Sequence, residues 1–170
     1  MEEIKNKVAE SGLLQMDLAN FKPTIEIVGI DIAPQLWEGL ILKEKDFRLW
    51  IKEHDWSEYQ KKAVFIFCSA DAIVPVWAYM LITSKLAEIN AISIVGTKNE
   101  LQKSLIKHSI ESVDLSEYQD TKIIVKGCSD IASPEYAMAT FLAHFQKVAS
   151  SIMFGEPCST VPIYKRKKGL

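Results

Sequence analysis

The chain has no long apolar run, no signal-like start and no nucleotide-binding motif. Its 170 residues, 48% of them hydrophobic, suit a globular protein with a full core. No stretch reaches the roughly 18 apolar residues of a membrane span. The opening Met1-Glu2-Glu3 lacks the basic and then apolar profile of a signal peptide. Neither a Gly-x-Gly-x-x-Gly nor a Walker pattern occurs, and the net charge of −2 gives no general attraction to nucleic acid. We therefore expect a cytoplasmic protein that binds neither nucleic acid nor membrane.

Cysteine is scarce, and each of the three cysteines precedes a serine and follows an apolar run that predicts a β-strand. The pairs are Cys68-Ser69, Cys128-Ser129 and Cys158-Ser159. Three cysteines cannot all pair within one chain, and thiols in a reducing compartment are usually free. Metal binding, thiol reactivity or simple core packing therefore come ahead of disulfide formation.

An internal repeat organises the chain. The segment DWSEYQ at 55–60 recurs as DLSEYQ at 114–119, an offset of 59 (114 − 55). Each copy is followed by an apolar run, a Cys-Ser pair, a proline, a helical pattern and a second apolar run that ends in glycine. The prolines (134 − 75) and the glycines (155 − 96) keep the same offset. Two copies of one supersecondary unit predict a pseudo-twofold arrangement.

Each copy reads as strand, turn, helix and strand. The apolar runs and helical spacings predict strands at 64–67, 91–95, 123–125 and 151–154 and helices at about 75–89 and 134–148. A short helix is expected at 2–10, and the alternating segment 25–32 is expected to be an added strand that could run antiparallel. The predicted fold is a single α/β domain over 1–170, with a mostly parallel sheet built from two pseudo-twofold β-α-β repeats and an N-terminal added strand. Its parts are an N-terminal extension at 1–42, repeat units at about 43–96 and 97–156, and a C-terminal tail at 157–170.

The expected topology brings the cysteines toward one crevice. Two right-handed β-α-β units in one parallel sheet give the strand order second, first, third, fourth, so that the strands ending at Cys68 and Cys128 are central neighbours. Their helices leave on opposite faces, which defines the switch-point crevice of an open sheet. Cys158 follows the fourth strand, and its loop could fold over the same place.

Three thiolates suit zinc or an iron–sulfur cluster, with the fourth position filled by a protein group, water or a partner. The predicted metal ligands are Cys68, Cys128, Cys158, Asp71 and Asp130. Two alternatives stay open. One cysteine could be the nucleophile of a sulfur-transfer enzyme, since a position before a helix N-terminus favours the thiolate. The cysteines could instead be packed small hydrophobic residues in a non-catalytic protein-interaction module.

Four segments resemble a bacterial family, Domain of Unknown Function family 2480. They are GLILKEKDFR at 39–48, CSADAIVPVWAYM at 68–80, KGCS at 126–129 and SIMFGEPCSTVP at 151–162. The likeness covers nearly the whole chain. It implies a stand-alone bacterial protein with no recognised catalytic residues to carry over. It also implies a gene neighbourhood of iron–sulfur cluster assembly, whose proteins would then be the partners. A homodimer is compatible with each of the three functions.

Overall fold

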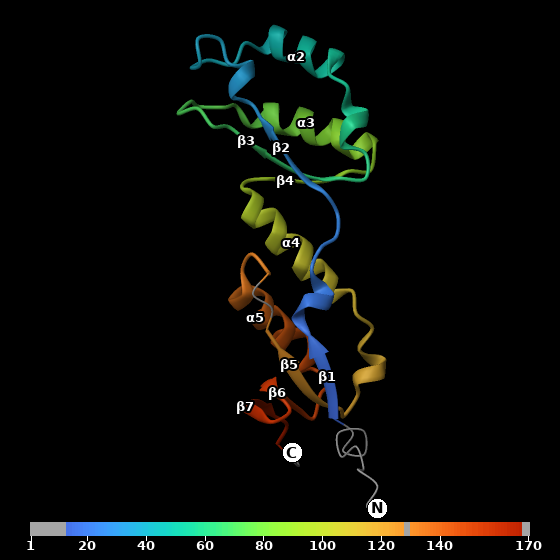
Figure 1. The fold of residues 1–170 in the computed structure, drawn as a ribbon. Coiled ribbons are helices and arrows are strands. Elements are labelled where there is room, and N and C mark those ends of the chain that lie inside the picture. Colours follow the sequence, from blue (N-terminus) through green and yellow to red (C-terminus); the bar gives the residue numbers. More distant parts are fainter. Residues whose placement is uncertain (1–12, 128–129, 168–170) are drawn as a thin grey trace, which may run out of the picture. The chain divides into compact units, whose positions relative to one another are not determined.

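The computed structural model describes residues 13–127 and 130–167. Contacts divide the chain into two compact units. The first unit is Thr24–Gln102, and the second unit combines Met1–Pro23 with Lys103–Leu170. The second unit is thus built from two segments that are far apart in the sequence. Figure 1 shows the elements of both.

The first unit is a parallel three-stranded sheet with helices packed on it. Its elements are β2 (Ile27–Asp31), the 3-10 helix η2 (Ala33–Gln35), α2 (Glu44–Glu53), the 3-10 helix η3 (Trp56–Tyr59), β3 (Ala63–Phe67), α3 (Val76–Glu88) and β4 (Ile92–Val95). The strand order is β2-β3-β4, with every pair parallel. Val64 and Ile66 of β3 form one core cluster with Phe47 of α2 and Ile82 of α3. Both helices therefore cover the same face of this sheet.

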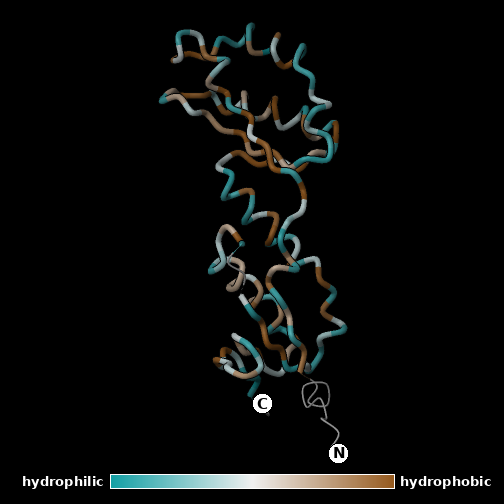
Figure 2. The backbone as a smooth tube through the Cα atoms, in the orientation of Figure 1, coloured by the Kyte–Doolittle hydropathy of each residue, from teal (hydrophilic) through white to brown (hydrophobic). Residues whose placement is uncertain are grey.

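The second unit repeats this plan and adds a strand. Its elements are β1 (Leu13–Asp17), the 3-10 helix η1 (Leu18–Phe21), α4 (Lys98–Glu111, which begins at the end of the first unit), the 3-10 helix η4 (Leu115–Tyr118), β5 (Lys122–Lys126), α5 (Pro134–Phe145), β6 (Ser151–Glu156) and β7 (Ser159–Lys165). The strand order is β1-β5-β6-β7, and only β7 is antiparallel to its neighbour. The core joins Ile123 and Val125 of β5 to Phe141 and Phe145 of α5. The hydrophobic middle of β5 is visible in Figure 2.

The α/β class, the mostly parallel sheets and the two β-α-β repeats are confirmed. A 3-10 turn precedes each repeat strand, η3 before β3 and η4 before β5, and an aspartate caps each turn. The Asp55 carboxylate accepts a hydrogen bond from the Ser57 amide at 3.0 Å, and the Asp114 carboxylate accepts one from the Ser116 amide at 2.9 Å. An aspartate two residues before a backbone N–H is a standard way to start such a turn.

The prediction of one continuous sheet is wrong, because β3 and β5 belong to different sheets. Each repeat strand pairs with a strand of its own from the N-terminal extension, β2 with β3 and β1 with β5. The strand expected at 25–32 is confirmed as β2, but it runs parallel to β3. The mixed sequence LLQMD gave no alternation by which to recognise β1. The repeat therefore reaches further than 43–156 and includes β1 and β2.

The C-terminal segment expected as a tail contains a strand. β7 pairs along β6 from Glu156↔Ser159 to Ser151↔Lys165. Arg166, just after β7, forms an ion pair with Asp120 and donates a hydrogen bond to the Val148 carbonyl. The helix expected at 2–10 lies outside the described residues. In the part of the chain that is described, no helix has the length and hydrophobicity needed to span a bilayer.

Candidate functional site

The loop after β3 carries the Cys68 thiol, and the end of β2 holds this loop in place. Asp31, the last residue of β2, lies opposite Phe67 in the sheet register. Its carboxylate accepts hydrogen bonds from the Ser69 amide at 2.9 Å and from the Ser69 hydroxyl at 2.5 Å. It also accepts one from the Ala33 amide at 3.0 Å. Asp31 therefore ties the first residue after Cys68 to the neighbouring strand.

This carboxylate is ionised at neutral pH. Partial burial acts to raise the pKa of Asp31, but the hydrogen bonds from the Ser69 hydroxyl, the Ala33 amide and the Ser69 amide outweigh burial and lower the pKa below its ordinary value. A charged acceptor makes stronger hydrogen bonds than a neutral one. The negative charge of Asp31 is thus a fixed feature beside the Cys68 loop.

The Cys68 thiol is half-buried and lies against the core of the first unit. Its sulfur is 3.6 Å from the Ala70 carbonyl oxygen, toward which the S–H points as a weak donor. Tyr79 of α3 is close enough to interact with it electrostatically: burial and the negative charge of a Cys68 thiolate raise the pKa of Tyr79. The Ala70 carbonyl oxygen and the Tyr79 side chain of α3 therefore lie near the sulfur, which packs against the core.

The helix does not begin next to this thiol. α3 starts at Val76, and the loop 68–75 lies between it and β3. Because the helix dipole acts within about the first turn, the expected activation of Cys68 by a helix N-terminus does not follow from its position. The hydrogen bonds of Asp31, by contrast, act directly on the adjacent residue.

The other predicted ligands lie apart in the chain. Asp71 is exposed in the Cys68 loop of the first unit. Cys158 is exposed in the turn between β6 and β7, and Asp130 is exposed and 3.6 Å from the Lys22 ammonium, both in the second unit. Cys128 falls outside the described residues. Among the residues that are described, no group of three or more histidine, cysteine, aspartate or glutamate side chains is arranged to hold a metal ion.

Asp31 was not among the residues singled out from the sequence, although a signal for it exists. β1 and β2 both end in aspartate, Asp17 and Asp31, and each carboxylate accepts a hydrogen bond from the amide two residues further on. Asp17 also forms an ion pair with Lys126, at 3.0 Å. Aligning the two N-terminal strands with each other, and not only the segments at 55–60 and 114–119, would have marked both residues.

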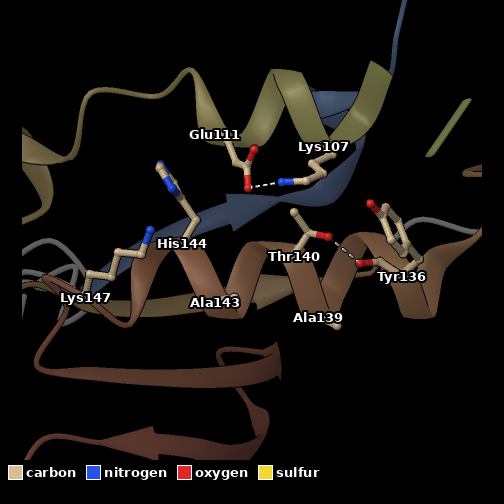
Figure 3. Close-up of a pocket in the computed structure, with 8 residues that line it drawn as sticks. All are labelled: Lys107, Glu111, Tyr136, Ala139, Thr140, Ala143, His144 and Lys147. Carbon is tan, nitrogen blue, oxygen red and sulfur yellow. Dashed lines mark hydrogen bonds and ion pairs between the residues drawn. The ribbon is translucent and has the colours of Figure 1, made fainter. Parts of the chain in front are cut away.

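A second gathering of polar groups lines a groove of about 320 Å³ between α4 and α5 of the second unit (Figure 3). Lys107 and Glu111 of α4 form an ion pair within their helix. The hydrogen bond between them raises the pKa of Lys107 and lowers the pKa of Glu111. Electrostatic interaction with His144 and Lys147 lowers the pKa of Glu111 further. The Glu111 carboxylate therefore interacts with Lys107 in its own helix and with Lys147 across the groove.

His144 is the buried polar residue of this groove. Its ring nitrogen Nε2 lies 3.2 Å from the Val113 carbonyl, just beyond the end of α4, and donates to it. The ring also makes an edge-on contact with Phe145, with centroids 5.4 Å apart. This agrees with a structural role for the residue, because one nitrogen satisfies a free carbonyl near a helix end. We accordingly treat the Cys68 loop as the candidate functional site.

Comparison with known proteins places the chain in a family without naming an activity. No curated protein and no solved structure matches it. A family model matches residues 2–166, almost the full length, which confirms the resemblance found in the four sequence segments. The chain belongs to the family described as Protein of unknown function (DUF2480).

Proposed function

We propose that this protein is a cytosolic metal-binding protein that uses cysteine thiolates to hold zinc or an iron–sulfur cluster, as an accessory to iron–sulfur cluster assembly. The partners would be proteins of that assembly process. The proposed ligand set is the one named from the sequence, Cys68, Cys128, Cys158, Asp71 and Asp130. Thiolates are the preferred ligands of both kinds of metal centre.

The Cys68 loop is the observation that carries the proposal. Its thiol stands at the carboxyl end of a parallel strand, where α/β proteins place their ligands. Asp31 accepts two hydrogen bonds from Ser69, the residue that follows Cys68, and these bonds hold the loop beside the thiol. Cys68 is only half-buried and Cys158 is exposed, so neither thiol is sealed within a core. A ligand can therefore reach both.

Metal content of single variants tests the proposal. The full chain is purified without oxygen, its iron, zinc and sulfide are measured, and the measurement is repeated after reconstitution with each metal. Cys68→Ser and Cys158→Ser should each lose most of the bound metal, while Ser159→Ala, which changes the neighbour of Cys158 and keeps the thiol, should retain it. Asp71→Asn and Asp130→Asn report on the oxygen ligands. A wild-type chain that holds neither iron nor zinc after reconstitution would contradict the proposal.

Sulfur transfer is a second candidate, favoured by the exposure of Cys158 in a tight turn. In such a transfer, a Cys158 thiolate attacks the terminal sulfur of a partner's cysteine persulfide. A new S–S bond forms on Cys158, and the partner's S–S bond breaks to release its thiolate, with no external oxidant. Incubation with a persulfide donor should add one sulfur atom to Cys158, as read by peptide mass, and Cys158→Ser should remove the modification. Equal and slow modification of every cysteine would count against this function.

A further inference from the structure

The edge strand β4 of the first unit's sheet lacks the features that usually prevent pairing with another strand. Within the described residues β4 pairs with β3 on one side and with no strand on the other. The Gly96 amide donates to the Ile66 carbonyl of β3 at 3.0 Å. Because backbone groups of successive strand residues point to opposite sides, those of Ser93 and Val95 point away from β3. β4 contains neither a charge nor a proline, the devices by which sheet edges usually prevent pairing.

In the second unit, a strand pairs with the side of β6 that corresponds to the free side of β4. With the offset of 59, β4 at 92–95 corresponds to 151–154 of β6, and the two registers agree: Val64 lies opposite Ser93 as Ile123 lies opposite Ile152. β6, however, has a further neighbour, the antiparallel strand β7. The first unit thus has the plan of the second unit with one strand missing at its edge.

The helix beside β4 has a groove where the missing strand would lie. This groove, of about 660 Å³, is lined by uncharged and mostly apolar residues: Val76, Tyr79, Met80, Thr83, Ser84, Ala87 and Val95. The same helix positions of α5 line a groove in the second unit, with Glu135, Met138, Ala139 and Leu142 at the places of Val76, Tyr79, Met80 and Thr83. There Ile163 of β7 forms part of the lining. A strand beside β4 could contact the α3 groove in the same way.

The exposure of large apolar side chains marks the same surface. Among the residues that line this groove, Val76 is 74% exposed, Met80 65% and Val95 55%. By contrast, the edge strand β7 contains Pro162 and ends in Lys165, and its pairing with β6 has a register irregularity. These features protect an edge from further pairing. The protein therefore carries edge protection on β7 and lacks it on β4.

We propose that β4 and the apolar face of α3 form a homodimer interface, in which β4 pairs antiparallel with β4 of a second copy. A twofold axis perpendicular to the strand direction makes two identical strands antiparallel, and the same residues then lie on both sides of the interface. Antiparallel is also the orientation that β7 adopts on β6. The groove residues carry no charge, so two copies of this surface meet without like-charge repulsion. Two three-stranded sheets then join into one continuous sheet.

The oligomeric state of the full chain tests this interface. The mass of the wild type is measured by light scattering and by sedimentation over a wide range of concentrations. Val95→Lys and Met80→Lys place a charge on the proposed interface and should weaken the dimer at least about tenfold. Val161→Lys is the matched control: Val161 is 58% exposed on β7, so the same change falls on another edge strand and should leave the mass unchanged. Circular dichroism verifies that each variant is folded.

Hydrogen exchange gives a readout that needs no variant. The amides of Ser93 and Val95 should exchange more slowly as the wild-type concentration rises through the dimer transition, since pairing uses their outward-facing backbone groups. A monomer at every concentration would overturn the proposal and leave the edge to a strand of another protein. A dimer that tolerates both lysine variants, or in which these two amides gain no protection, would also overturn it.

Discussion

Asp31 is the residue whose replacement should affect the candidate site most clearly. Asp31→Ala removes three hydrogen bonds, two from Ser69 and one from Ala33. A hydrogen bond to a charged group contributes about 1.5–3 kcal/mol when it is well shielded from water. Both Ser69 groups are exposed and can turn to water, so we expect a total loss of about 2 kcal/mol in the free energy of unfolding. Asp31→Asn keeps one acceptor oxygen and should lose about half as much.

The labelling rate of the Cys68 thiol distinguishes a local effect of Asp31 on the loop from a general loss of stability. Without Asp31 the loop 68–75 loses its attachment to β2, and Cys68 should react faster with an alkylating reagent under native conditions. Asp17→Ala is the matched control, since Asp17 accepts the corresponding hydrogen bond from Ala19 in the second unit and also forms an ion pair with Lys126. It should lower stability and leave Cys68 labelling unchanged.

The assay combines urea unfolding at neutral pH with labelling of Cys68 followed by peptide mass analysis. A change of less than about 0.5 kcal/mol in the unfolding free energy of Asp31→Ala, the scatter of ordinary surface substitutions, together with Cys68 labelling at the wild-type rate, would contradict this role of Asp31. Faster labelling in Asp17→Ala to the same degree would show that the effect is not local.

Two further predictions concern β2. Gly29→Ala should destabilise the protein by about 1–3 kcal/mol in urea unfolding, because a Cβ at residue 29 would lie 2.5 Å from the Phe65 ring. Adding Phe65→Ile to this variant should recover part of the loss. In the second unit the equivalent pair is Gln15 and Ile124, where an isoleucine lies opposite a residue that has a side chain. Because the folded pKa of Asp31 lies below the ordinary value of 3.8, its stabilisation is complete above that value and is lost as the pH falls through the folded pKa. Acid unfolding curves should therefore fall less steeply below about pH 4 in Asp31→Asn than in wild type, and equal slopes would contradict this.

The elements of each repeat follow from local sequence. The apolar runs before Cys68 and Cys128 form β3 and β5, and the helical spacing after Pro75 and Pro134 forms α3 and α5. Strands buried on a helix-covered face must be apolar, and a helix that packs on them must have an apolar stripe, so both leave a periodic signal. β1 left no such signal, because its residues are mostly only half-buried or exposed.

The candidate site was predicted in part. The position of Cys68 after a strand is confirmed, since β3 ends at Phe67. The crevice between the strands of Cys68 and Cys128 does not exist as one sheet edge, because these strands have different partners. Pairing between β2 and β3 joins residues far apart in the sequence, and it is this pairing that places Asp31 beside Ser69. A local pattern contains no information on such a partner.

The sequence by itself determined the repeat, the α/β class, the strand ends that carry the thiols and the family to which the chain belongs. These features depend on periodicity and spacing, which are written along the chain. Only the tertiary structure decided which strands are neighbours, that two sheets form in place of one, that Asp31 holds the Cys68 loop, and that β4 is an open edge where its counterpart β6 is covered by β7. The physical reason lies in strand pairing. The backbone hydrogen bonds between strands are nearly the same for every residue, so they do not by themselves select a partner strand. Side-chain packing in the folded protein determines which strands pair.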